Sequence, residues 1–386
     1  MTPPTVSVFT PSHDARYLDN AWASLQAQTY GDWEWIVVLN QRARWEPAHR
    51  DERLRLYTAD DLEGVGAAKQ RACGLANGDV LLELDHDDEL VPNALDAVMA
   101  AFEAHPDAGL VYSDFAQILA NGAPDLSRFD QSYGWDYYEA EVDGRTLQVT
   151  RALDPLPHNV SLIWFAPNHV RAFRRTDYLD AGGYDATRSI LDDQDLIMRL
   201  WQVSTFVCIH EPLYLQRFHE ANTQRNAEVN ATIQAETLAL YDAGIEAATA
   251  AWAVRNDLDL VRLDSPTLPD AEESSLGLIV AIDILNRVAD PIAWLNRAYW
   301  LLAHAGMLLT MTPSTDGRGA WMDPRARSYW NELTFTNLTS APRLDGLAAR
   351  FQVSRLVTYD EGGIPYVCAN LAAVKDGPRL GGQLPP

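Results

Sequence analysis

The chain contains few cysteines and few basic residues for its length. The three cysteines, Cys73, Cys208 and Cys368, are far apart and have no metal-like spacing, so we expect a reducing compartment and structural thiols. Acidic residues outnumber basic ones 54 to 30, which gives a net charge of −24. This balance disfavours a phosphate backbone, so we expect no stable nucleic-acid partner, although a local basic groove is compatible with it.

Long apolar runs are also absent. The N-terminus MTPPTVSVFT has no basic region followed by a leader-like stretch, and the most apolar run, LGLIVAIDIL, is short and contains Asp283. We therefore expect a soluble, cytoplasmic protein without a membrane span. The sequence contains enough apolar residues to form a buried core, since 47% of its 386 residues are hydrophobic and 12 are Trp. A chain of this length favours two domains.

The first half of the chain alternates β-rich runs with helical stretches, as in a mostly parallel sheet covered by helices. Strands are expected at 5–10, 33–39, 54–58, 79–85 and 109–115, and helices at 18–28, 66–76 and 93–105. The Ala-rich, proline-free residues 226–256 indicate one long or two shorter connecting helices. The α/β rhythm then restarts, so we predict domains at 1–225 and 257–386 with a helical connector between them, and a boundary near residue 250.

Residues 81–90 read LLELDHDDEL, in which acidic side chains follow an apolar run that is typical of a buried strand. Carboxylates gathered at a strand end repel one another unless a positive charge lies between them. Asp85 and Asp87 form an Asp-x-Asp step, which offers hard oxygen ligands to Mg²⁺ or Mn²⁺. The alternative is a solvated acidic loop that favours the start of the helix after Pro92.

Four segments, in order, resemble family 2 glycosyltransferases of the GT-A fold. They are VSVFTPSHD with SLQAQTYGDWEWIVVLN, GAAKQRACGLANGDVLLELDHDDEL, FRRTDYLDAGGYD with LDDQDLIMRL, and LYLQRFHEANT. The likeness covers about residues 5–225, and the ordered combination is more specific than any single motif. It implies a Rossmann-like nucleotide-diphospho-sugar transferase domain with a mostly parallel sheet.

The resemblance also implies roles for individual residues. Asp87 would be the surer metal ligand, with Asp85 nearer the sugar or ribose and His219 adding an imidazole ligand. Asp193 matches the catalytic base. The implied nucleotide-sugar-binding residues are Thr10, Ser12, His13, Asp14, Asn40, Lys69, Asp85, His86 and Arg217.

Each of these residues also has a purely structural explanation. His13 is equally typical of a surface loop, and Lys69 of an exposed helix position. Asp193 precedes an apolar-periodic stretch, as acids at a helix N-terminus do. Arg217 and His219 fit ion pairs with acidic neighbours in a protein of this charge.

The sequence departs from the family pattern after the second strand. Many relatives have an Asp-Asp-Gly-Ser-like run there, whereas this chain has VLNQRA, with Leu39 and Asn40 in those places. An Asn amide still offers a donor and an acceptor to a base edge, so the base stays open among UDP-, GDP- and dTDP-sugars. The Gln-x-x-Arg-Trp pattern of processive synthases is absent, which favours single-sugar transfer.

The expected activity is inverting, metal-dependent transfer of one sugar to an acceptor hydroxyl on a glycan, a protein or a modified nucleotide. The divalent cation, Mn²⁺ or Mg²⁺, would neutralise the leaving diphosphate while Asp193 takes the acceptor proton. The aromatic stretch SYGWDYYEAEVDGR, within residues 120–160, fits acceptor stacking or simple packing. The alternatives are a catalytically silent sugar-nucleotide-binding scaffold and a bifunctional enzyme that also methylates.

Residues 257–315 resemble the latter half of class I SAM-dependent methyltransferases. No Gly-x-Gly-x-Gly turn precedes them, and Asn286 and Arg287 replace the usual Glu-His pair. We therefore expect a smaller, truncated α/β methyltransferase-like domain that does not bind SAM. Docking, oligomerisation as a homo-oligomer, or acceptor positioning are its predicted roles.

Overall fold

The computed structural model describes residues 5–49, 51–160, 162, 166–220, 227–340, 344–377 and 379–382. The chain divides into two compact units, and the main division falls within α7 (Ala227–Arg255). The first unit comprises Met1–Gln131, Trp135–Pro155 and Val160–Ala243, and the second Ser132–Gly134, Leu156–Asn159 and Gly244–Pro386. The predicted domain limits stay a prediction.

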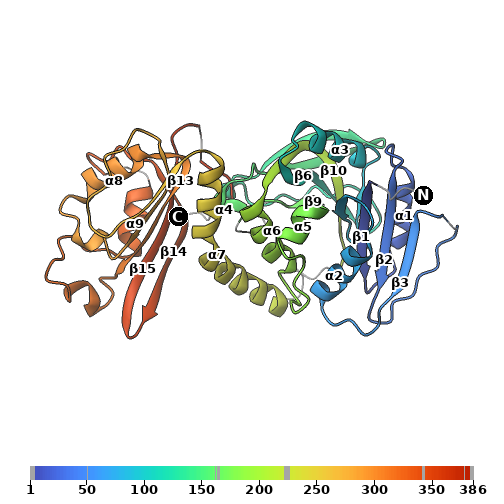
Figure 1. Ribbon diagram of the computed structural model, residues 1–386, viewed down its shortest axis with the longest axis horizontal. Helices are drawn as coiled ribbons and strands as arrows, with labels where there is room; N and C mark the ends of the chain where they lie inside the picture. Colours follow the sequence, from blue (N-terminus) through green and yellow to red (C-terminus); the bar gives the residue numbers. More distant parts are fainter. Residues whose placement is uncertain are drawn as a thin grey trace. The chain divides into compact units, whose positions relative to one another are not determined.

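The first unit is built on a ten-stranded sheet with the order β3-β2-β1-β4-β9-β6-β10-β5, to which the hairpin β7-β8 is added along β6. Figure 1 shows β1, β2 and β3 of this sheet side by side. Its strands are β1 Val6–Ser12, β2 Trp33–Leu39, β3 Leu54–Thr58, β4 Val80–Glu83, β5 Glu89–Leu90, β6 Ala108–Leu119, β7 Asp136–Val142, β8 Arg145–Arg151, β9 His169–Arg174 and β10 Thr205–Phe218. Strands β3, β2, β1 and β4 are parallel, and so are β6 and β10. The sheet is less uniformly parallel than expected, because β9 runs antiparallel between β4 and β6.

The apolar sequence of the central strands accounts for their burial. All seven residues of β2 are buried, as expected for a strand covered on both faces. Helix α1 packs its apolar side on this sheet, and the rings of Trp22 and Trp35 stack 5.3 Å apart. The helices of the unit are α1 Leu18–Gln26, α2 Val65–Leu75, α3 Ala94–Ala104, α5 Arg175–Asp180 and α6 Asp192–Val203, and α4 Pro157–Val160 lies at the division between the units.

Strand β4 ends at Glu83, two residues before the predicted end of this strand. Asp85, His86 and Asp87 therefore lie in the turn that follows β4, and the side-chain alternation of the strand does not extend to them. The C-terminal ends of β1 and β2 lie beside this turn, since Ser12 pairs with Leu39 and Phe9 pairs with Glu83. In open α/β sheets, ligands bind at such strand ends.

The second unit contains a five-stranded sheet with the order β11-β12-β13-β15-β14. The strands are β11 Asp259–Arg262, β12 Leu276–Ile282, β13 Leu302–Pro313, β14 Phe351–Glu361 and β15 Ile364–Ala373, with helices α8 Pro291–Leu301 and α9 Glu332–Thr339. Strands β11, β12 and β13 are parallel, and β15 is antiparallel to both of its neighbours. Its core includes Trp330, Phe335 and Leu308.

Among the helices of the described residues, none combines the length and the apolar character that crossing a membrane requires.

Candidate functional site

A buried ion cluster lies beneath the carboxyl end of β4. The Lys69 ammonium, from α2, is 2.6 Å from Glu83 Oε1 and 2.9 Å from Asp192 Oδ2. Arg171, from β9, places Nη1 2.8 Å from Asp193 Oδ2 and 3.5 Å from Glu83 Oε2. The chain has only two lysines, Lys69 and Lys375, and one of them is held inside this cluster. Its ammonium is engaged by carboxylates, so the nucleotide contact predicted for Lys69 is not seen here and stays a prediction.

The two cations determine how the carboxylates of this cluster titrate. Burial alone would raise the pKa of Glu83, but the charges of Lys69 and Arg171 outweigh it and hold the pKa below its ordinary value. Tyr184 also donates a hydrogen bond to Glu83 Oε2 at 3.0 Å. Burial raises the pKa of Asp192, and Lys69 opposes that shift. Glu83 is thus paired from within the chain.

Asp193, the predicted catalytic base, lies in the first turn of α6. It follows Leu191, which has a left-handed backbone with a φ of 54°. Burial would raise the pKa of Asp193, but Arg171 and Lys69 lower it overall, so the side chain is a carboxylate at neutral pH. The Asp193 side chain keeps 22% of its surface exposed, compared with 6% for Asp192. Asp193 is therefore the acid of this cluster that an acceptor can reach, although its place in the first helical turn also suits a purely structural role.

A second group of acidic residues occupies the turn after β4. His219 Nε2 lies 2.8 Å from Asp87 Oδ2, with both side chains largely buried. The ring of Tyr17 packs on His219 with the centroids 5.2 Å apart. The two predicted ligands are thus brought together from the turn after β4 and from the residue that follows β10, and their contact equally satisfies the ion-pair alternative. The end of the LYLQRFHEANT segment, residues 221–223, lies outside the described residues.

Asp85 stands apart from the Asp87–His219 pair. Among the described residues, only Asp114, Cys208 and His210 bring three metal-ligating side-chain atoms within 4.8 Å of one another, so Asp85 does not complete such a set with Asp87 and His219. Its backbone N–H donates to the Tyr214 hydroxyl at 3.2 Å. Burial and the neighbouring charges of Glu83 and Asp87 raise the pKa of Asp85 to about 7. The charges of Lys69 and Arg171 oppose this shift without cancelling it.

Arg217 is buried beneath this turn and forms hydrogen bonds to it. Its side chain is 1% exposed, and its Nε donates to the Asp87 carbonyl oxygen at 2.8 Å. Its backbone N–H donates to Asp88 Oδ1 at 2.6 Å, and its guanidinium pairs with Glu89. The ring of Tyr17 covers the guanidinium at 4.8 Å. Arg217 therefore holds the acidic turn in shape, and the predicted contact with a diphosphate stays a prediction.

The predicted base and ribose residues line the ends of β1 and β2. His13 is exposed, and its ring lies 4.9 Å from that of His86, whose pKa is lowered by burial. Asp14 pairs with Arg16 at 2.6 Å, and this bond lowers the pKa of Asp14. The Ser12 hydroxyl is turned inward and donates to the Asp14 carbonyl oxygen at 2.8 Å.

Asn40 and Thr10 differ in how their polar atoms are used. The Asn40 N–H donates to the Ser12 carbonyl oxygen at 2.9 Å, but its buried side-chain oxygen has no hydrogen-bond partner within the described chain. Such an orphaned acceptor is costly unless a ligand or water satisfies it. The Thr10 hydroxyl is instead fully used, because it donates to the Leu84 carbonyl oxygen and accepts from Trp35 Nε1. Thr10 lies in the core beneath the site.

Sequence reasoning missed Arg171 and the two tyrosines that support the acids, Tyr184 and Tyr214. Arg171 could have been noticed in HVRAFR, the sequence of β9, because it is a charged residue between two apolar ones. An arginine in a central strand needs a buried acidic partner. Its partners Glu83 and Asp193 come from other elements, so the pattern alone did not identify them.

Comparison with known proteins finds a family match within the first unit. Residues 7–146 match the family described as "Glycosyl transferase family 2". The O-antigen biosynthesis protein RfbC of Myxococcus xanthus is 28% identical over 250 residues, covering 62% of this chain and 18% of that protein. The putative colanic acid biosynthesis glycosyl transferase WcaA of Escherichia coli is 31% identical over 104 residues, covering 25% of this chain and 37% of that protein. The chain thus spans well under two thirds of either relative.

Among solved structures, S. aureus TarS 1–349 in complex with UDP-GlcNAc aligns with a TM-score of 0.44 and 15% identity, covering 65% of this chain and 73% of that one. The family match lies over β1, β2 and β4, the strands whose ends carry the acidic turn and Asn40. The family match supports the expected GT-A-like α/β fold for the first unit, whereas the methyltransferase-like second domain stays a prediction. Residues 7–146 match the model of glycosyl transferase family 2, and this match supports the predicted enzyme class, a glycosyltransferase.

Proposed function

We propose that this chain transfers a single sugar from a nucleotide-diphosphate sugar to an acceptor hydroxyl, with inversion at the anomeric carbon and with the help of a divalent cation. The observation that carries the proposal is the division of the acids around β4. Glu83 and Asp192 are neutralised by Lys69, whereas Asp85, with a raised pKa, and the Asp87–His219 pair lie in the turn above them. A turn of this kind is completed by positive charge from outside the chain.

The donor set in the turn fits Mn²⁺ or Mg²⁺. Asp87 and His219 supply an oxygen and an imidazole nitrogen from one place, and such ions are commonly held by one or two carboxylates plus substrate phosphates. Asp85 is proposed to face the sugar or ribose. When bound, the cation would supply charge to stabilise the leaving diphosphate. Arg217 keeps the turn in position through the Asp87 carbonyl oxygen and Asp88.

Asp193 is the proposed general base. Its Oδ1 accepts from the Gln194 N–H at 2.8 Å and its Oδ2 from Arg171, which fixes the carboxylate in one orientation. The acceptor oxygen forms a bond to the anomeric carbon as the bond to the diphosphate oxygen breaks, and its proton passes to Asp193. One direct displacement inverts the configuration, as in inverting glycosidases, where the base also lies on the face away from the leaving group.

The nucleotide is proposed to bind at the ends of β1 and β2. The orphaned side-chain oxygen of Asn40 supports this, since a base edge offers the N–H that this acceptor lacks. His13 and Asp14 lie on the same rim and are accessible to the ribose. UDP-, GDP- and dTDP-sugars are the donor classes to compare.

For the second unit we propose docking, oligomerisation or acceptor positioning rather than methylation. Strand β11 follows α7 directly through Asn256, Asp257 and Leu258, without a glycine turn for a cofactor. Asn286 is buried, and its carbonyl oxygen accepts from the N–H groups of Arg327 and Ser328. These features support a shortened domain in which the loops form contacts within the domain and do not bind a cofactor.

The proposal is tested by incubating the purified chain with UDP-, GDP- and dTDP-sugars and Mn²⁺, and by measuring nucleotide release. We expect one donor class to be consumed, with activity lost in EDTA and reduced by roughly 100-fold or more in Asp87→Ala. Asp96→Ala, an acidic change in α3 away from the turn, is the matched control. Nucleotide binding without turnover would favour a silent scaffold, and full activity of Asp87→Ala would refute the metal role. SAM binding by calorimetry would overturn the assignment of the second unit.

A further inference from the structure

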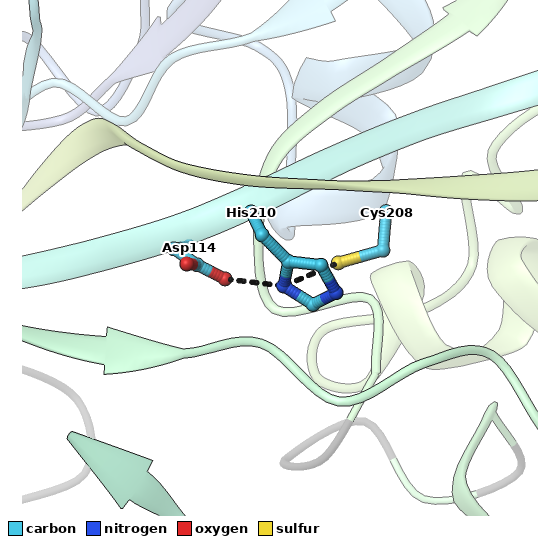
Figure 2. Close-up of side chains that lie close together, drawn as sticks. All are labelled: Asp114, Cys208 and His210. Carbon is cyan, nitrogen blue, oxygen red and sulfur yellow. Dashed lines mark hydrogen bonds and ion pairs between the residues drawn. The ribbon is translucent and has the colours of Figure 1, made fainter. Parts of the chain in front are cut away.

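A second cluster of metal-ligating side chains lies between β6 and β10. Asp114 comes from β6, and Cys208 and His210 from β10. His210 Nδ1 is 3.2 Å from Asp114 Oδ1 and 4.0 Å from Cys208 Sγ. Figure 2 shows the imidazole of His210 directed between the carboxylate and the thiol. Among the described residues, this is the one set in which three such donor atoms all lie within 4.8 Å of one another.

This cluster is separate from the acidic turn. Phe115, the next residue of β6, packs its ring on His169 at 4.8 Å, and His169 stacks on Tyr214, whose hydroxyl binds Asp85. Consecutive residues of a strand point to opposite faces, so Asp114 points away from the side that Phe115 shares with Tyr214. The nucleotide-side residues therefore do not account for the Asp114 cluster.

The surrounding groups orient Asp114 and His210. The Tyr138 hydroxyl donates to Asp114 Oδ2 at 2.8 Å, and the Ala152 N–H donates to Asp114 Oδ1 at 2.7 Å. On the other side of the imidazole, Asp154 Oδ1 lies 3.3 Å from His210 Nε2. A carboxylate on the far nitrogen of a histidine sets the tautomer that leaves the near nitrogen free to bind a metal. The arrangement of Asp154, His210 and Asp114 matches that requirement.

We propose that Asp114, Cys208 and His210 bind a divalent transition-metal ion, with Zn²⁺ as the best match to one oxygen, one sulfur and one nitrogen donor. Tetrahedral zinc with bonds of roughly 2.0–2.3 Å separates its ligand atoms by about 3–4 Å, close to the spacings seen here. Cys208 releases its proton as the thiolate–metal bond forms, and His210 carries its remaining proton on Nε2, toward Asp154. A water molecule completes the fourth position.

The ion would stabilise the irregular pairing of β6 with β10. The pairing of β10 with β6 shifts register between Ile209 and Pro212 and again before Tyr214, next to the cluster. A metal bound across the two strands at this point would fix the bulge that precedes Tyr214, Arg217 and His219. We therefore assign the site a structural role in the first unit. The competing explanation is a hydrogen-bonded Asp–His pair beside a thiol, without any ion.

The test is a Co²⁺ titration of the full, reduced, metal-stripped chain, followed by absorption spectroscopy. We expect one Co²⁺ to produce a thiolate-to-cobalt charge-transfer band that Zn²⁺ abolishes by competition. Cys208→Ser should remove the band, and His210→Gln should weaken Co²⁺ binding roughly 100-fold or more, given that even outer partners change metal affinity by about 10–100-fold. Cys368→Ser, a matched thiol change in the second unit, should keep the band, and so should Asp87→Ala.

Folding is checked in parallel by circular dichroism, and His210 is exposed, so His210→Gln is the variant least prone to misfold. Tyr138→Phe should have a smaller effect and reduce the affinity for Co²⁺ by about tenfold. No charge-transfer band in the wild-type chain, or a band that survives in Cys208→Ser, would overturn the proposal. A Co²⁺ spectrum that lacks the charge-transfer band and whose remaining d–d absorption disappears in Asp87→Ala would assign the ion to the acidic turn instead.

Discussion

Two groups of acidic residues lie near the end of β4, one in the buried ion cluster below it and one in the turn above it. They differ in the source of the positive charge that balances their carboxylates. Below, Glu83, Asp192 and Asp193 are matched by Lys69 and Arg171 within the chain. Above, the Asp87 carboxylate lies 2.8 Å from the His219 imidazole, and the pKa of Asp85 is raised to about 7. Internal neutralisation suits Glu83 and Asp192 to a structural role, whereas we propose that the acids left with mutual repulsion bind a cation and a phosphate.

The largest effect is expected from removing the internal cation. Lys69→Met leaves Glu83 and Asp192 buried without their shared ammonium, and breaking a buried pair from one side typically costs about 3–5 kcal/mol. Urea unfolding measures the change in free energy. Lys375→Met, the only other lysine substitution that the sequence allows, is the matched control and should have a much smaller effect. Equal stability of wild type and Lys69→Met would remove the distinction between the two groups of acids.

Asp193→Asn tests the one acid of the lower group that is assigned to chemistry. The amide keeps the shape and still accepts from Arg171 but takes no proton, so we expect transfer to fall by about 100-fold or more, with donor binding unchanged. Steady-state kinetics with saturating donor and acceptor, together with calorimetric titration of the donor, separate the two effects. Asp192→Asn is the control, because Asp192 is buried against Lys69. Retained transfer in Asp193→Asn would make Asp193 a purely structural residue.

The smallest effect concerns Asp85 and has a defined pH dependence. Its pKa in the folded chain lies near 7 and above that of an unfolded Asp, so the folded state binds more protons and loses stability as pH rises from about 4 to about 7. Asp85→Asn removes this penalty. Because Asp85 is partly exposed, we expect a gain of roughly 1–2 kcal/mol at pH 8 and almost none at pH 4, in EDTA.

Denaturant unfolding at the two pH values provides that comparison. With Mn²⁺ and the donor present the order should reverse, because the cation and the diphosphate then stabilise the wild-type carboxylate more than the amide. A pH-independent gain would show that Asp85 is not strained by its neighbours. In that case the contrast between the lower and upper acids would rest on Asp87 and His219 alone.

The sequence by itself determined the α/β class, the strands around LLELDHDDEL and the order of segments that marks the family. Local patterns carry this information, because apolar runs and turn residues act over a few positions. They also placed Asp87 and His219 in one site through the family likeness. The unusual Asn40 was visible as well, although its unsatisfied oxygen was not.

Only the tertiary structure decided which acids pair with Lys69 and Arg171 inside the first unit. The strand ended at Glu83, so alternation did not carry Asp85 and Asp87 to the same place. Lys69 was predicted at the nucleotide and Arg217 at the diphosphate, yet in the structure both are turned inward. An ion pair depends on a few ångströms between side chains from different elements, and no local pattern encodes that distance. For the same reason Cys208, expected to be a structural thiol without metal-like spacing, lies beside His210 and Asp114.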